Sequence, residues 1–167
     1  ETDKDIRREL EYINRLEINV AFPFLIKVYD DYVNSIISKS IFIKILTLVQ
    51  SYIFRRFIVG LPTNALNKIF MSLYDKVDKN DYLFSVQKSL IQRTAAQRFP
   101  KNLEVKDALK VKDVYHIQAK NRTYLLERLE NHENKEPVLI DGNQDITIEH
   151  IFPQNPDPKW KIELETD

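Results

Sequence analysis

Residues 41–60 read IFIKILTLVQSYIFRRFIVG and form the most apolar part of the sequence. Apolar side chains occupy most sides of a helix drawn through it, so we expect this helix to form the centre of a helical bundle. Its charge-free part, residues 45–54, is far shorter than the ~20 residues that a bilayer span requires, which favours a buried helix. Ser40 is the expected N-cap, and Gly60 is the expected end of the helix.

Apolar residues recur at helical spacing on both sides of this stretch, and no fixed internal repeat is present. The further helices predicted in this way cover about residues 3–19, 23–38, 64–77, 82–99, 102–110, 111–118 and 122–131. The expected fold class is therefore mainly α, a multi-helix bundle.

The character of the sequence changes at Pro137. The segments PVLI (137–140) and DITIE (145–149) contain β-branched residues, and the intervening DGNQ (141–144) is typical of a turn. We therefore expect a short β-hairpin after the bundle. This pattern predicts two domains, a helical one over residues 1–135 and a second one over residues 136–167.

The composition excludes several classes of function. The only two glycines, Gly60 and Gly142, cannot build a glycine-rich phosphate loop. The absence of cysteine excludes disulfide frameworks, cysteine zinc sites and thiol nucleophiles, and it agrees with the cytoplasmic location that we expect, away from any membrane. The net charge of +0 provides no overall field for nucleic acid, which disfavours a basic RNA-binding domain.

Glu149 and His150 place a carboxylate beside an imidazole where the expected second strand ends. An imidazole can take a proton from water near neutral pH, and a carboxylate can hold Mg²⁺ against a phosphate oxygen. The pair therefore suits phosphodiester hydrolysis. A solvent-exposed polar pair beside a turn is the alternative interpretation, because any Glu-His dipeptide at a strand end has the same description.

The string IEHIFPQ at residues 148–154, together with residues 122–131 and the segment WKIEL at 160–164, resembles the C-terminal region of GmrSD-type restriction endonucleases. This bacterial family defends against phage. Pro153, Gln154 and Trp160 belong to the resembling positions. An upstream motif resembles the helical segment of the same family. It consists of Arg55, Arg56, Gly60, Thr63, Asn64 and Asn67.

The resemblance implies a ββα-metal, or HNH, nuclease that hydrolyses DNA, with His150 as the general base and Glu149 beside Mg²⁺ or another divalent metal ion. It also implies a nucleotide-hydrolysing N-terminal domain in the same protein. The family pattern continues beyond residue 167, so we expect residues 136–167 to be the first part of a truncated nuclease domain. By itself this part is expected to hold no metal firmly and to leave DNA uncut. Its C-terminal segment is expected either to be disordered after about Pro153 or to self-associate.

A non-catalytic helical module that couples other domains is the alternative function. The upstream motif also has simpler structural interpretations. Arg55 and Arg56 could compensate the helix dipole or pair with a buried acid, whereas Thr63 and Asn64 could cap a helix. In the same way, Asn67 is a local polar partner and Trp160 a packing anchor.

Overall fold

The structure is a computed structural model that describes residues 3–147 and 157–164. The helices in chain order are α1 (Lys4–Arg15), α2 (Phe22–Val33), α3 (Lys39–Ile58), α4 (Leu66–Leu73), α5 (Tyr82–Ile91), α6 (Asn102–Val111), α7 (Ala119–Glu130) and α8 (Pro158–Leu164). Short 3₁₀ turns occur at η1 (Asn19–Ala21), η2 (Tyr74–Lys76) and η3 (Ala95–Gln97). The predicted mainly helical fold is confirmed.

The chain divides into two compact units, residues 1–125 and 126–167. Such units are defined by contacts alone, so the domain boundary predicted between residues 135 and 136 stays a prediction.

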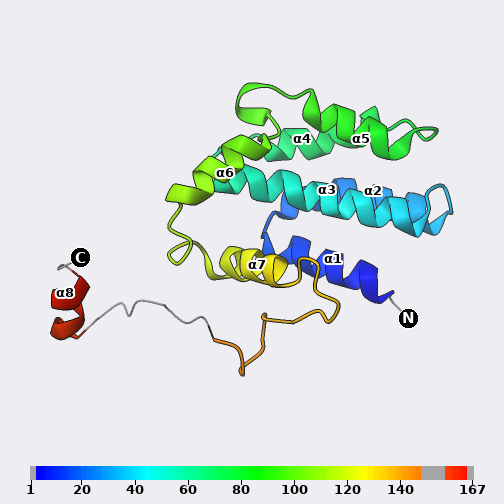
Figure 1. Cartoon of the computed structure of the whole chain (residues 1–167). Helices are drawn as coiled ribbons and strands as arrows, with labels where there is room; N and C mark the ends of the chain where they lie inside the picture. The colour runs from blue at the N-terminus through cyan, green and yellow to red at the C-terminus, as the bar shows by residue number, and fades with distance from the viewer. Residues whose placement is uncertain (1–2, 148–156, 165–167) are drawn as a thin grey trace. The chain divides into compact units, whose positions relative to one another are not determined.

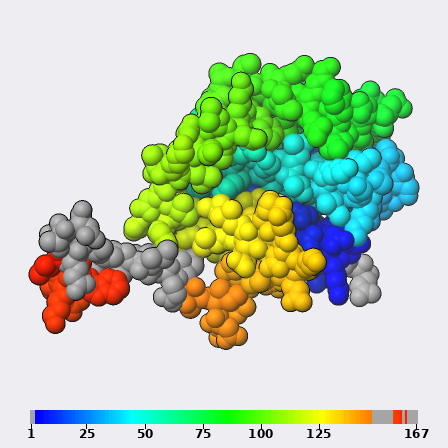
Figure 2. Space-filling view, viewed as in Figure 1, coloured from blue at the N-terminus to red at the C-terminus, as the bar shows by residue number. Residues whose placement is uncertain are grey.

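Helix α3 is the centre of the first unit, as predicted. Helices α1, α2, α5 and α6 each pack against it, and Figure 1 shows it between α1 and the α4–α5 pair. Neighbouring helices leave only a strip of α3 visible in the space-filling view of Figure 2. The buried residues point in most directions around its axis: Phe42, Ile45, Leu46, Val49, Gln50, Tyr52, Ile53, Arg56 and Ile58.

The two ends of α3 are fixed by local hydrogen bonds. Ser38, rather than the predicted Ser40, is the N-cap, because its extended backbone lets its Oγ accept a hydrogen bond from Ile41 N at 3.3 Å. At the other end Gly60 has a φ of 73°, and the amides of Gly60 and Leu61 donate to the oxygens of Phe57 and Arg56. This is a Schellman motif, which confirms the predicted end at Gly60.

Gln50 connects three helices inside the core. Its Nε2 donates to the backbone oxygen of Glu9 at 3.1 Å and to Oε2 of Glu9 at 2.9 Å, while its Oε1 accepts a hydrogen bond from Tyr124 Oη at 3.3 Å. All three side chains are buried. Because buried polar groups have to be satisfied, these bonds specify how α1, α3 and the start of α7 align.

Asp31 ties α2 to the segment that follows α4. Its carboxylate accepts hydrogen bonds from Tyr82 Oη at 2.6 Å, Tyr74 Oη at 2.8 Å and Lys79 Nζ at 3.1 Å. Burial by itself would raise the pKa of Asp31, but these three donors hold the pKa below its ordinary value of 3.8. Burial, followed by the hydrogen bond to Asp31, raises the pKa of Tyr74 to about 12.

The predicted β-hairpin is wrong for the residues that the structure describes. A turn is present, with Gly142 at a φ of 72° and Asn143 N donating to Ile140 O at 3.2 Å, but residues 137–147 contain no strand. The reason is that side chains at the end of α7 bind the backbone of residues 138–141, which a partner strand would otherwise bind. Residues 148 and 149 of the predicted second strand lie outside the described residues.

We predict that Asp31→Asn lowers the free energy of unfolding by about 1–3 kcal/mol at pH 7, because a buried acceptor loses its charge while three donors remain. The folded-state pKa of Asp31 lies below 3.8, so its contribution is complete above that pH and is lost as the pH falls through the lowered value. The difference between variant and wild type should therefore shrink in acid. Urea unfolding followed by circular dichroism measures it.

The matched control is Asp30→Asn, one position away, where the carboxylate is exposed. An equal loss of stability in both variants would contradict the assigned role of Asp31.

Candidate functional site

The predicted catalytic pair, Glu149 and His150, lies outside the described residues, as do Pro153 and Gln154. The structure describes the chain up to Thr147 and again from Asp157. Trp160 lies in α8, where 48% of its surface is exposed. The described residues that bear on the site are the segment before the predicted pair and the upstream motif.

Asn131, just after α7, holds the segment that leads to the predicted catalytic pair. Its Nδ2 donates to Val138 O at 2.8 Å, and Val138 N donates to its Oδ1 at 2.7 Å. The side-chain amide thus bonds both backbone groups of one residue, as a neighbouring strand would. The segment is fixed without a sheet.

Glu127 forms a second attachment. It precedes Asn131 by four residues and therefore lies one helical turn earlier. Its Oε2 accepts hydrogen bonds from Ile140 N at 2.9 Å and Asp141 N at 3.2 Å, and its surface is 0% exposed. Hydrogen bonds to a carboxylate are stronger than those between neutral groups. Together Glu127 and Asn131 attach residues 138–141 to the end of α7.

These two residues were not identified from the sequence. Glu127 lies in a stretch, residues 98–135, where acids and bases alternate as is typical of a solvated helix face, but its carboxylate is buried. The only available signal is the i,i+4 spacing of an acid and an amide at a helix end, followed by Pro137. Many exposed helix ends have the same pattern.

Arg56 of the upstream motif is 2% exposed and is bound by neutral oxygens. Its Nη1 donates to Ala96 O at 2.7 Å and its Nη2 to Pro62 O at 2.7 Å. The predicted buried acid is not its partner: Arg56 forms no ion pair among residues 3–147 and 157–164. Backbone carbonyl groups from two loops take that place.

Arg55 lies on the neighbouring surface of α3. Its Nε donates to Ser51 Oγ at 3.1 Å, and its Nη1 donates to Pro100 O at 3.1 Å. Its guanidinium also lies over the ring of Phe99, 5.7 Å from the centroid. These contacts fasten the loop before α6 to the end of α3.

The remaining residues of the upstream motif are not all brought together. Thr63, Asn64 and Asn67 are exposed, and α4 begins after Ala65 without a side-chain cap. The expected cap by Thr63 or Asn64 is therefore wrong. The backbone of Thr63 serves instead, because Leu66 N donates to its oxygen at 2.9 Å.

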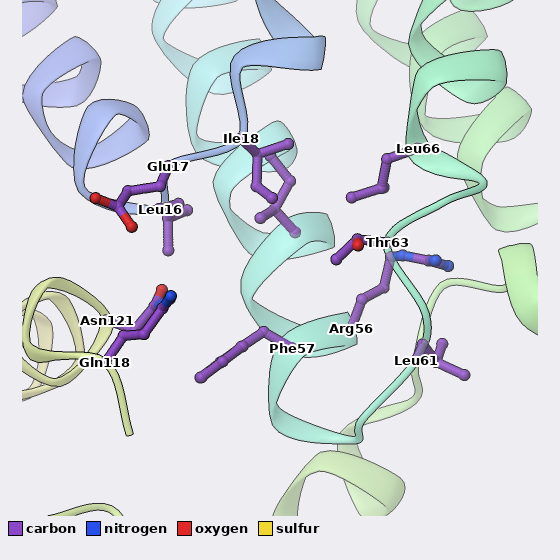
Figure 3. Close-up of a pocket in the computed structure, with 11 residues that line it drawn as sticks. Leu16, Glu17, Ile18, Arg56, Phe57, Leu61, Thr63, Leu66, Gln118 and Asn121 are labelled. Atoms are coloured by element: carbon purple, nitrogen blue, oxygen red, sulfur yellow. The ribbon is translucent and has the colours of Figure 1, made fainter. Parts of the chain in front are cut away.

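Arg56 and Thr63 line a cavity of about 260 Å³ in the first unit, shown in Figure 3. Leu66 reaches it from α4, while Gln118 and Asn121 reach it from the start of α7. Asn64 and Asn67 are not among the lining residues. The motif thus contributes two side chains to one wall of this cavity.

The described residues lack both a metal-binding cluster and a membrane-spanning helix. No group of three or more His, Cys, Asp or Glu side chains is placed there to hold a metal ion. None of the helices in this part of the chain combines the length and the apolar character needed to cross a bilayer.

Comparison with known proteins gives one family. Residues 99–167 match the family model described as GmrSD restriction endonucleases, C-terminal domain. The predicted resemblance to this family is confirmed for these residues. No protein of curated function and no solved structure matches the chain.

We predict that Asn131→Ala speeds amide hydrogen exchange at Val138 by roughly tenfold, because a hydrogen bond worth about 0.5–1.5 kcal/mol is lost. Exchange followed by NMR measures this residue by residue. Asn134→Ala is the matched control, since its Oδ1 accepts only from Glu136 N, at 3.1 Å, and does not touch Val138. Unchanged exchange at Val138 in Asn131→Ala would mean that the attachment is not formed in solution.

Proposed function

Because residues 99–167 carry the C-terminal domain of GmrSD restriction endonucleases, we propose that this chain is part of a DNA endonuclease of bacterial phage defence with an HNH-type site. The observation that supports the proposal is the position of Glu149 and His150 inside the matched range. Because both residues lie outside the described part of the chain, the support for their role is the chemistry of their side chains.

His150 acts as the general base in this proposal. Its imidazole takes a proton from a water molecule, whose oxygen then attacks the phosphorus of a DNA phosphodiester, and the bond to the leaving sugar oxygen breaks. An imidazole has an ordinary pKa of about 6.5, so it is available as a base near neutral pH.

Glu149 offers the kind of hard oxygen ligand that Mg²⁺ and similar divalent ions prefer. Such an ion, when bound, neutralises charge on the phosphate and on the leaving oxygen. Mg²⁺ favours six oxygen ligands in near-octahedral geometry, and one carboxylate supplies too few of them. We propose that the remaining ligands come from outside this sequence and that the 167 residues alone do not cut DNA.

The attachment of residues 138–141 to α7 fixes the chain shortly before the proposed catalytic pair. The amide of Asp141 is bound by Glu127, and Asp141 precedes His150 by nine positions in the sequence. A short path from a fixed point limits how far the base can move, which lowers the entropic cost of placing it against a phosphate. Glu127 and Asn131 are therefore positioning residues in this proposal.

The proposal includes two partners, DNA and a nucleotide-hydrolysing domain of the same protein, and a cytoplasmic location. A non-catalytic coupling role is the second candidate. Its support is that residues 1–125 form a compact unit with its own core around α3, and that neither Glu149 nor His150 lies in it. The two functions can belong to different parts of one protein.

We predict that the intact protein nicks plasmid DNA in the presence of Mg²⁺ or Mn²⁺, and that His150→Ala lowers the rate roughly 10²–10⁴-fold, the usual contribution of a general base. Gel electrophoresis of supercoiled plasmid measures the rate. The 167-residue chain alone should leave the plasmid uncut.

The matched control is His132→Ala in the intact protein, because His132 is exposed and lies in the same matched range. Equal cleavage by the His150→Ala protein would exclude the proposed base. Cleavage by none of the proteins, with nucleotide supplied, would favour the coupling role.

A further inference from the structure

The cavity beside Arg56 is not explained by the proposed nuclease reaction. It lies between the turn after α1, the end of α3, the segment before α4 and the start of α7, all within residues 1–125. Six apolar side chains, including Phe57 and Leu66, form most of its lining, together with five polar ones. Its volume of about 260 Å³ is just below the range typical of sites for drug-sized ligands.

Arg56 gives this cavity a positive charge. No acidic side chain among the described residues pairs with it. Both of its terminal nitrogens donate to backbone carbonyl groups, and its Nε is buried without a hydrogen-bond partner among the described residues. The carboxylate of Glu17, which also lines the cavity, pairs with Lys120 at 2.7 Å. A buried cation with only neutral partners is unfavourable, and an anion nearby would relieve that cost.

A second guanidinium adds to the positive potential. Burial, and to a smaller degree the charge of Arg56, lower the pKa of Arg93, whose Nη1 donates to the neutral Gln97 Oε1 at 3.0 Å. Arg93, like Arg56, forms no ion pair among residues 3–147 and 157–164. Arg56 on α3 and Arg93, just after α5, are therefore both bound by neutral oxygens.

The opposite side of the cavity carries two amide side chains. Asn121 is 4% exposed, and its Nδ2 donates to Gln118 Oε1 at 2.9 Å. This arrangement leaves Gln118 Nε2 as a donor and Asn121 Oδ1 as an acceptor, neither with a partner among the described residues. Figure 3 shows both side chains reaching in from α7, across from Arg56 on α3. A cavity that is only a packing defect is normally apolar throughout, and this one is not.

We infer that this cavity is a binding site for a small organic anion, a molecule with an apolar body the size of one ring and a single carboxylate or phosphate group. The apolar lining accommodates the ring, and the positive charge of Arg56 favours the anionic group. Gln118 and Asn121 provide one donor and one acceptor for polar substituents. Arg56 and Thr63 of the upstream motif thereby acquire a role separate from DNA hydrolysis.

The test uses benzoate and phenyl phosphate as probes, with neutral benzamide for comparison, added to the ¹⁵N-labelled chain. The side-chain signals of Arg56 Nε–H, Gln118 and Asn121 should shift in a saturable way. The two anions should bind at least about tenfold more tightly than benzamide, because they add a charge-assisted hydrogen bond. Equal affinities for the three probes, or no saturable shift with any of them, would overturn the inference.

A cavity-filling variant locates the site without removing the charge. Leu61 is half-buried in the lining, so Leu61→Trp should fill the space and abolish binding of both anions. Leu103→Trp is the matched control: Leu103 is 69% exposed on α6, outside the cavity, and binding should be unchanged. Undiminished binding by a folded Leu61→Trp protein would place the probes elsewhere and reject the site.

Arg56→Gln tests the charge directly and should reduce binding of the anions to the level of benzamide. The substitution also removes the hydrogen bonds to Ala96 and Pro62, so its fold is checked by circular dichroism. If this variant does not fold, the probe comparison and Leu61→Trp decide the question. Nuclease activity enters none of these measurements, so they are independent of the proposed function.

Discussion

A helix of 20 residues that is apolar on most sides has to be covered on most sides, and the arrangement of the first unit follows from this constraint on α3. Helices α1, α2 and α5 bury apolar side chains in the core around α3, although some of their apolar residues, such as Ile26 and Phe84, stay exposed. Burial alone does not fix how these helices align. The hydrogen bonds of Gln50 with Glu9 and Tyr124 do so, because a shift of any of the three would leave a buried polar atom unsatisfied.

The end of α3 is where this architecture meets the features that bear on function. Gly60 turns the chain away from the helix, and Arg56 then binds the returning segment through Pro62 O and the 3₁₀ turn before α6 through Ala96 O. One side chain therefore joins three pieces of backbone. The same side chain lines the cavity, so the structural bonds of Arg56 also hold its charge in the place where an anion would use it.

Much of this fold could be predicted from sequence because helical periodicity is a local signal. Helix α3, its end at Gly60 and the helical character of the chain all follow from it. The absence of the β-hairpin from the described residues could not be predicted from such a local signal. The β-branched residues and the Asp-Gly turn do favour strands, but strand pairing was lost to competition from Asn131 and Glu127, which bind the same backbone groups. Such competition depends on three-dimensional proximity and leaves no periodic pattern.

The partners of Arg56 illustrate the same limit at the upstream motif. A buried arginine predicts an acid nearby, because charge pairing is the usual way to bury a cation. Here carbonyl groups from residues 62 and 96 are used, and a carbonyl group is present at every position of a sequence, so nothing in the amino-acid letters marks these two. Glu149 and His150, in contrast, are candidates through residue type, neighbourhood and the family resemblance, and their role stays a prediction; both lie within the range that matches the GmrSD C-terminal domain.

In the proposed reaction His150 removes a proton from water in the intact protein. The most direct measurement is the pH dependence of DNA cleavage by the intact protein at saturating metal ion. If His150 is the base, we expect the rate to be constant at higher pH. It should fall about tenfold per pH unit below the range where an imidazole takes up a proton, near its ordinary pKa of about 6.5. A rate that stays constant to well below that range would contradict it.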